Sequence, residues 1–200
     1  YYFALTFCDQ SSSTINTKDI LFDMTTNCVL DLNGSTLKCA PNDYIKFSYI
    51  RFTNCNFLIK NGFIVGDKVN HDYSFGGTQE LGWGIEVRGA TGKIENMDIS
   101  MMLADAIYIW KNYNLSNWSI ISSGDVVVEN CKLHNCRRQG ISFTGNNFFE
   151  IKNCDIYNIG TYDGITGTNP MSGIDLEFEW AEHTAGTMLI HDNRFWDCDG

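Results

Sequence analysis

Two segments of this chain have one pattern: Val128-Glu129-Asn130-Cys131-Lys132-Leu133 and Ile151-Lys152-Asn153-Cys154-Asp155-Ile156. Each reads aliphatic, charged, Asn, Cys, charged, aliphatic. The pattern recurs upstream and, more loosely, downstream, in Ile59-Lys60-Asn61-Gly62-Phe63-Ile64, Ile94-Glu95-Asn96-Met97-Asp98-Ile99 and Ile190-His191-Asp192-Asn193-Arg194-Phe195.

A second pattern alternates with the first. It is a small residue followed by apolar, variable and apolar positions, and the loops between the two patterns are polar and variable in length. A short fixed unit with variable loops is typical of a stacked repeat. No helical periodicity separates the units, which excludes a βαβ fold and predicts an all-β solenoid of parallel strands. The second pattern is seen in residues 84–87, 106–109, 140–143 and 173–176.

The composition excludes several classes of protein. A formal net charge of −10 argues against nucleic acid and against an anionic membrane surface. No apolar run approaches the ~20 residues that a membrane helix needs. The start has no initiator Met and no charged-then-apolar segment, so no signal peptide is expected in this chain. We expect the solenoid to cover residues 27–200 and to be truncated at both ends. Residues 1–26 are expected to be either an irregular N-terminal segment or a fragment of a preceding coil.

The eight cysteines admit a disulfide framework, but their register favours buried thiols. Cys131 and Cys154 occupy the repeat position of Met97, which is an apolar position. The spacing of the cysteines and histidines matches no metal site.

Period-two alternation predicts which side chains face outward. Ile85, Ile107, Ile141 and Ile174 are expected in a buried ladder. The residues that follow them, Glu86, Tyr108, Ser142 and Asp175, then form an outer column, and long loops on both sides are expected to make this strand the floor of a groove. The recurring asparagines are interpreted as corner residues, because Asn tolerates a left-handed turn.

These units resemble the right-handed parallel β-helix of the pectate-lyase-like superfamily, which includes pectin-degrading enzymes and the phage tailspikes that cut polysaccharides. The resemblance implies a single-stranded right-handed β-helix. The pectin hydrolase motifs Asn-Thr-Asp, Asp-Asp and Gly-His-Gly are absent, as is the Arg-x-Pro-x-x-Arg loop of pectate lyases, so only action on or binding of a polysaccharide is implied. The narrower resemblance, to β-helix proteins of phages and gut bacteria, rests on residues 66–73, 82–85, 104–109, 137–142 and 172–177.

Asp175 and Glu177 are the first candidates for a catalytic pair. Outward residues two apart on a strand are ~6.6–6.8 Å apart along the backbone, near the lower limit for the carboxylates of inverting glycosidases. Arg138, one coil below, is expected to orient a carboxylate or an acidic sugar, and Arg137 lies beside it. The alternative is a solvated strand face with no catalytic role.

Asp105 and Glu86, on neighbouring coils, form a second candidate pair with a spacing suited to a retaining enzyme. For Asp105, a corner cap is the alternative. His71 beside Asp72 and Tyr73 is a weaker candidate for acid–base or substrate-binding work, and a surface loop is the simpler interpretation.

An aromatic cluster favours a carbohydrate ligand, because sugar rings pack on aromatic faces. Tyr108 and Trp110 are expected to point outward, and Trp83 and Trp180 flank them as further substrate-binding candidates. No cofactor is expected. Calcium is left open, since Asp155, Asp175, Glu177 and Glu179 are available but have no ligand spacing.

The sequence therefore favours a depolymerase that cleaves glycosidic bonds, with a hydrolase preferred to a lyase or epimerase. The alternatives are a non-catalytic carbohydrate-binding or receptor-binding module and a structural shaft. By the resemblance, the expected location is extracellular or on a virion tail, with a polysaccharide partner and a homotrimer in the full-length protein.

Overall fold

The computed structural model describes residues 2–5, 22–114, 116–178 and 185–200, and these residues are almost all strands and loops. Strand follows strand because the segments between the loops place apolar residues at alternate positions, and none of these segments has a helical repeat. The one helical turn described is a 3₁₀ turn, η1, at Tyr73–Phe75. The expected all-β class with parallel strands is confirmed.

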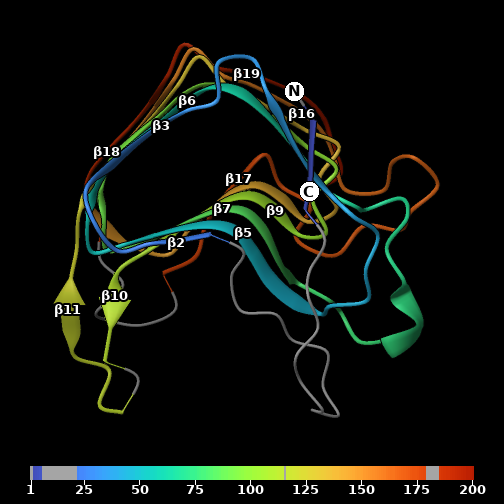
Figure 1. Ribbon diagram of the computed structural model, residues 1–200, viewed down its shortest axis with the longest axis horizontal. Helices are drawn as coiled ribbons and strands as arrows, with labels where there is room; N and C mark the ends of the chain where they lie inside the picture. Colours follow the sequence, from blue (N-terminus) through green and yellow to red (C-terminus); the bar gives the residue numbers. More distant parts are fainter. Residues whose placement is uncertain (1, 6–21, 115, 179–184) are drawn as a thin grey trace.

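Two parallel sheets make the fold, and the chain alternates between them (Figure 1). Sheet A forms the upper arc of Figure 1 and sheet B the layer below it. Sheet A contains β1 (Tyr2–Leu5), β3 (Cys28–Asp31), β4 (Thr36–Cys39), β6 (Asn56–Val65), β8 (Thr91–Ser100), β12 (Asp125–Glu129), β13 (Lys132–His134), β15 (Asn146–Lys152), β16 (Asp155–Ile159), β18 (Ala185–His191) and β19 (Arg194–Cys198). Sheet B contains β2 (Phe22–Met24), β5 (Lys46–Thr53), β7 (Leu81–Arg88), β9 (Asp105–Trp110), β14 (Gln139–Phe143) and β17 (Ile174–Leu176).

A small antiparallel hairpin, β10 (Asn112–Tyr113) and β11 (Ile120–Ser122), leaves the stack after β9 and extends away from both sheets (Figure 1). The parallel pairing also reaches the strands before residue 27. Strand β1 pairs with β4, and β2 pairs with β5.

The recurring asparagines lie at a corner of sheet A, as the sequence predicts. Asn61, Asn96, Asn130 and Asn153 have φ between 53° and 59°, which is the left-handed region that Asn tolerates. The Asn96 amide also donates to Asn61 at 3.2 Å. A second left-handed corner was missed, because its residue type varies from one coil to the next; it consists of Met101, Asn135, Asn158 and Asp197.

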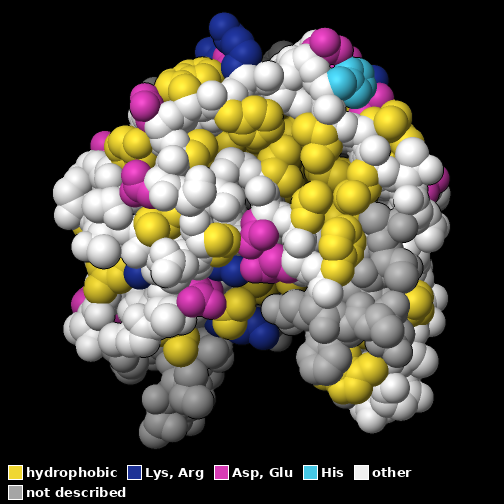
Figure 2. Space-filling model, turned by 180° about the vertical axis from the view of Figure 1, so that it is seen from behind, with side chains coloured by type: hydrophobic (Ala, Val, Ile, Leu, Met, Phe, Trp, Pro, Cys, Tyr) yellow, Lys and Arg dark blue, Asp and Glu magenta, His cyan; other side chains and the backbone are white. Residues whose placement is uncertain are grey.

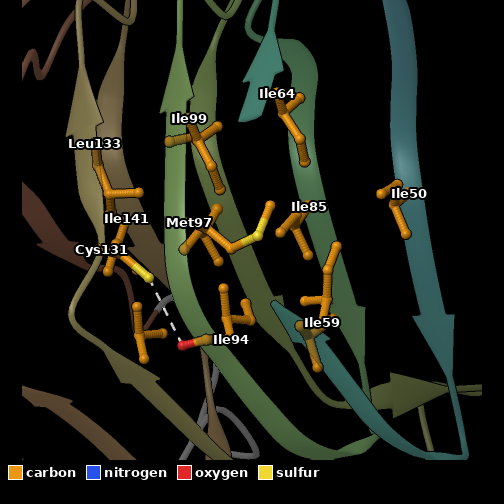
Figure 3. Close-up of a cluster of buried hydrophobic side chains, with 14 of the residues drawn as sticks. Ile50, Ile59, Ile64, Ile85, Ile94, Met97, Ile99, Cys131, Leu133 and Ile141 are labelled. Atoms are coloured by element: carbon orange, nitrogen blue, oxygen red, sulfur yellow. Dashed lines mark hydrogen bonds between the residues drawn. The ribbon is translucent and has the colours of Figure 1, made fainter. Parts of the chain in front are cut away.

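The core is a set of aliphatic ladders between the two sheets (Figure 3). Ile85, Ile107 and Ile141 have no exposed surface and pair in register with one another and with Ile174, so the predicted ladder is confirmed. Ile174 is partly exposed because it lies on the last strand of sheet B. Burial of such ladders is the main force that stabilises a stacked repeat.

The cysteines within the described residues are free thiols, and Cys131 and Cys154 are buried as expected. Sγ of Cys131 lies within hydrogen-bond distance of two carbonyl oxygens, that of Ile94 at 3.7 Å (Figure 3) and that of Glu129 at 3.2 Å. Burial raises the pKa of Cys131, so this thiol is a packing group and not a reactive one.

Replacing Cys131 by Ser is expected to destabilise the fold by about 1–3 kcal/mol, because a hydroxyl enters an apolar ladder. The measurement is the denaturant midpoint. Cys28→Ser is the matched control, since Cys28 is partly exposed, and a cost at Cys131 no larger than at Cys28 would contradict the assignment.

The last strands present apolar surface. Figure 2 shows a broad patch of hydrophobic side chains on the face opposite to the view of Figure 1. Strands β17, β18 and β19 each pair along one edge only, and unpaired edges of this kind favour association. The large apolar side chains exposed in this region are Leu176, Phe178, Leu189, Ile190, Phe195 and Trp196.

Candidate functional site

The outward column expected on sheet B is present. Glu86 pairs with Tyr108, Tyr108 with Ser142, and Ser142 with Asp175. The column is not open along its whole length, because Glu86 and Ser142 have no exposed surface. Asp175 and Glu177 are partly exposed. The column is therefore accessible at the end nearest β17 and covered at Glu86.

Arg138 lies at the centre of the accessible end. Its Nη2 donates to Oε1 of Glu177 at 2.7 Å, and its Nη1 lies 3.2 Å from Oδ2 of Asp105 and 3.3 Å from Oγ of Ser142. The Arg138 side chain is only 11% exposed. A guanidinium held by several acceptors orients the carboxylates around it. The predicted position of Arg138 beside the acids is confirmed.

Asp175 and Glu177 are in direct contact. Burial, together with a hydrogen bond and the charge of Glu177, raises the pKa of Asp175 to about 6, although Arg138 and Gln139 lower it. Gln139 Nε2 donates a short hydrogen bond to Asp175 Oδ2. The expected carboxyl separation, close to that of an inverting pair, is therefore wrong. Both side chains turn toward each other, which the backbone spacing could not show.

Asp105 has no exposed surface. It accepts from Ser142 Oγ at 2.9 Å and faces Arg138. Burial raises the pKa of Asp105 to about 7, while Arg138 and the Ser142 hydroxyl lower it. Asp105 directly precedes Ala106 and Ile107, which both lie in the core. A buried carboxyl cannot touch a polymer, so direct catalysis by Asp105 is not supported.

The pKa of Asp105 has a consequence for stability. The folded pKa lies above the unfolded value of about 3.9, so the folded state binds the proton more tightly. The contribution of Asp105 to the stability of the fold is therefore fully present below about pH 4 and is lost as the pH rises through about 7. Asp105→Asn removes this dependence, so its melting temperature relative to the parent should be higher at pH 8 than at pH 5. A difference that does not change between these pH values would contradict the pKa.

Glu86 is a buried structural carboxylate, contrary to the expectation of a groove acid. Oε2 accepts from Ser48 Oγ and from Arg51 Nε, both at 2.5 Å, and Oε1 accepts from Trp110 Nε1 at 2.9 Å. No hydrogen bond joins Glu86 to Asp105. The proposed Asp105–Glu86 catalytic pair is therefore wrong: each acid is buried among its own partners.

The aromatic candidates form a packed row. Trp83 is 7% exposed and stacks on Tyr108 with ring centroids 4.5 Å apart, so Trp83 supports its neighbour and offers no free face. Tyr108 and Trp110 are partly exposed, as expected. The Arg88 guanidinium covers one face of Trp110 at 4.7 Å. Trp180 lies outside the described residues.

His71 is not a surface residue. Its Nδ1 lies 2.8 Å from Asp67 Oδ2, and neither side chain is exposed. Asp72 instead caps the start of the 3₁₀ turn η1, where its side chain accepts a hydrogen bond from the N–H of Ser74. The interpretation of His71 and Asp72 as an acid–base pair is therefore wrong. Sequence adjacency suggested Asp72 as the partner, whereas the turn brings Asp67 to His71.

The acids considered for calcium do not converge. Asp155 pairs with Arg194 on sheet A, while Asp175 and Glu177 contact Gln139 and Arg138. Glu179 lies outside the described residues. Within the described part of the chain, no group of three His, Cys, Asp or Glu side chains is arranged to hold a metal ion, and no helix there could cross a bilayer.

Two contributors to the site were missed by the sequence analysis. Gln139 binds Asp175, and Arg51 neutralises Glu86. Arg51 faces the same column from β5, one coil earlier, where the repeat is less regular. A weak repeat signal in residues 46–53 was the reason that it was not found.

Residues 83–200 match the family described as the right handed beta helix region. This is more than half of the chain, and the chain belongs to that family. No solved structure matches it.

Two Bacillus subtilis (strain 168) proteins are similar to the chain. The SPbeta prophage-derived uncharacterized protein YorA is 36% identical over 146 residues, and the uncharacterized protein YclG is 31% identical over 126 residues. The aligned segments cover 68% and 61% of this chain but only 24% and 21% of the relatives. The chain thus spans about a quarter or less of these relatives' length.

Proposed function

We propose that this chain is the β-helix part of a polysaccharide depolymerase that hydrolyses a glycosidic bond at Asp175 and Glu177. The observation that carries the proposal is the contact between these two carboxyls beside Arg138. A carboxyl with its pKa raised to about 6 keeps its proton to a higher pH than a free carboxyl does. Its neighbour, Glu177, is paired with Arg138 and is assigned the role of the base. One acid and one base are thus side by side on an accessible surface.

The reaction follows from these two states. Asp175 donates its proton to the glycosidic oxygen as the bond from that oxygen to the anomeric carbon breaks. Glu177 takes a proton from a water whose oxygen bonds to the anomeric carbon. The sum is one water added and one glycosidic bond cleaved. The two carboxyls are closer than in either standard glycosidase geometry, so the bound sugar must separate them.

The surroundings suit this assignment. Arg138 fixes Glu177, Gln139 fixes Asp175, and Tyr108 and Trp110 lie partly exposed on the same face. An acid beside a base is the combination that hydrolysis uses, with the acid at the leaving oxygen and the base at the attacking water.

The remaining assignments belong to the same proposal. The two sheets close as a single right-handed solenoid like that of pectate-lyase-like and tailspike proteins. The prophage origin stated for YorA supports a role on a virion or outside the cell, on a bacterial surface polysaccharide. The exposed apolar edge strands support a homotrimer of the longer protein.

Product analysis tests the reaction. The protein is incubated with purified capsular and wall polysaccharides, both acidic and neutral. Hydrolysis should release new reducing ends with no absorbance from unsaturated sugars. Unsaturated products would replace hydrolysis by a lyase reaction, and the absence of products from any polymer would refute a depolymerase.

A non-catalytic binding module is the second candidate. The observation that favours it is the burial of Glu86 and Asp105, which leaves two acids at the accessible end of the column and an aromatic row beside them. If a polymer is retained intact and Trp110→Ala releases it, the binding module is the better description.

A further inference from the structure

A cavity of about 380 Å³ is lined in part by Arg137, the residue that precedes Arg138. It is formed where the loop after β6 meets the loop after β16. The two glycines in its wall, Gly77 and Gly164, have no atom within 4 Å of the position that a Cβ would take, so open space lies over the backbone there. The full lining is Tyr73, Gly77, Gln79, Arg137, Gly164, Ile165 and Thr166.

Arg137 is the one charged residue of this lining, and it is held rigidly. Nε donates to the carbonyl of Thr166 at 3.0 Å, and Nη1 donates to the carbonyls of Thr78 and Gln79 at 2.9 and 3.2 Å. The Tyr73 ring lies 5.3 Å from the guanidinium carbon. These contacts occupy Nε and Nη1, and within the described residues no hydrogen bond engages Nη2. The cavity therefore contains a fixed cation with donors to spare.

Gln79 provides an unpaired acceptor in the same cavity. The residue is 5% exposed, and its Oε1 has no hydrogen-bond partner. Its Nε2 donates to the carbonyl of Gly76 at 3.2 Å. This bond fixes the amide orientation, because a flipped amide would set two oxygens against each other. A buried acceptor with no partner is costly, and a ligand hydroxyl would satisfy it.

We infer that this cavity binds a glycan unit that carries an anionic oxygen group, with the anion at Arg137 and a hydroxyl at Gln79. The Tyr73 hydroxyl donates to the Lys68 carbonyl at 2.8 Å, so Tyr73 presents its ring to the cavity. Ile165 adds an apolar wall. Burial lowers the pKa of Arg137, and the carboxylate whose charge raises it is that of Glu80. A carboxylate or a phosphate on the sugar would fit this combination equally well.

The position of the cavity links it to the cleavage site. Arg137 and Arg138 are consecutive, and Arg138 contacts Glu177 while Arg137 faces the cavity. The inference rests on the proposed function only in taking the ligand to be part of a glycan substrate. It names the kind of sugar unit that would lie next to the bond that is cleaved.

Direct binding of small sugars is the test. D-glucuronate, glucose 6-phosphate and glucose are titrated into the protein and followed by NMR. At least one anionic sugar should bind at least tenfold more tightly than glucose, and the tighter of the two identifies the group as carboxylate or phosphate. Equal binding of all three sugars, or binding of none, overturns the inference.

Variants of Gln79 locate the binding without removing the Arg137 crosslink. Gln79→Glu should weaken the anionic sugar at least tenfold, because a like charge enters the cavity. Gln79→Leu should weaken it less and keep the preference over glucose. Unchanged binding by Gln79→Glu overturns the assignment to this cavity. Glu177→Gln should bind the anion as the parent does, so failure of the cleavage mechanism and failure of the cavity assignment give different results.

Discussion

Replacing Glu177 by Gln, or Asp175 by Asn, is expected to lower the rate of polysaccharide cleavage by about a hundredfold or more. Each amide keeps the shape of its carboxyl but cannot serve as acid or base. In the parent, Asp175 has a pKa of about 6 and shares a hydrogen bond with Glu177. The measurement is the rate at which reducing ends appear, at saturating and at limiting polymer.

The two variants should also differ in pH dependence. In the parent, activity should fall above about pH 6 as Asp175 loses its proton. The Asp175→Asn variant lacks this acid, so its small remaining activity should not show that fall. Asp155→Asn is the matched control, because Asp155 pairs with Arg194 on sheet A, away from the site. Parent-like cleavage by both site variants would exclude this pair as the catalytic groups.

Replacing Glu86 by Gln is expected to destabilise the fold by about 3–5 kcal/mol, because it leaves the Arg51 guanidinium nearly buried without a counter-charge. The side chains of Arg51 and Glu86 are 10% and 0% exposed. For a chain of this size the loss corresponds to a fall in melting temperature of about 6–20 °C. The measurement is thermal unfolding followed by circular dichroism.

A double variant separates the ion pair from local packing. Arg51→Met with Glu86→Gln removes both charges and should recover part of the loss, because no uncompensated charge remains. Lys93→Met is a control on a partly exposed ion pair, with Glu95 and Glu129 as partners, and should cost less than about 1 kcal/mol. If Glu86→Gln melts as the parent does, the structural role of Glu86 is wrong.

The regular part of the fold was predictable because a stacked repeat encodes each coil locally. Ile85, Ile107 and Ile141 alternate with outward residues, and Asn96, Asn130 and Asn153 recur where the backbone must turn left-handed. Both signals have a short range, since side-chain alternation and turn conformation depend on neighbours along the chain. Variable residues hid the second corner, and the weak repeat near β5 hid Arg51.

The sequence by itself determined the class of fold, the register of the column from Glu86 to Asp175, the buried thiols and the position of Arg138. Only the tertiary structure decided which acids are accessible. Arg51 and Ser48 reach Glu86 from an earlier coil, and Ser142 reaches Asp105 from a later one. The physical reason is that alternation sets the side of a strand on which a residue lies. Burial and pairing depend instead on side chains brought there by other coils and loops.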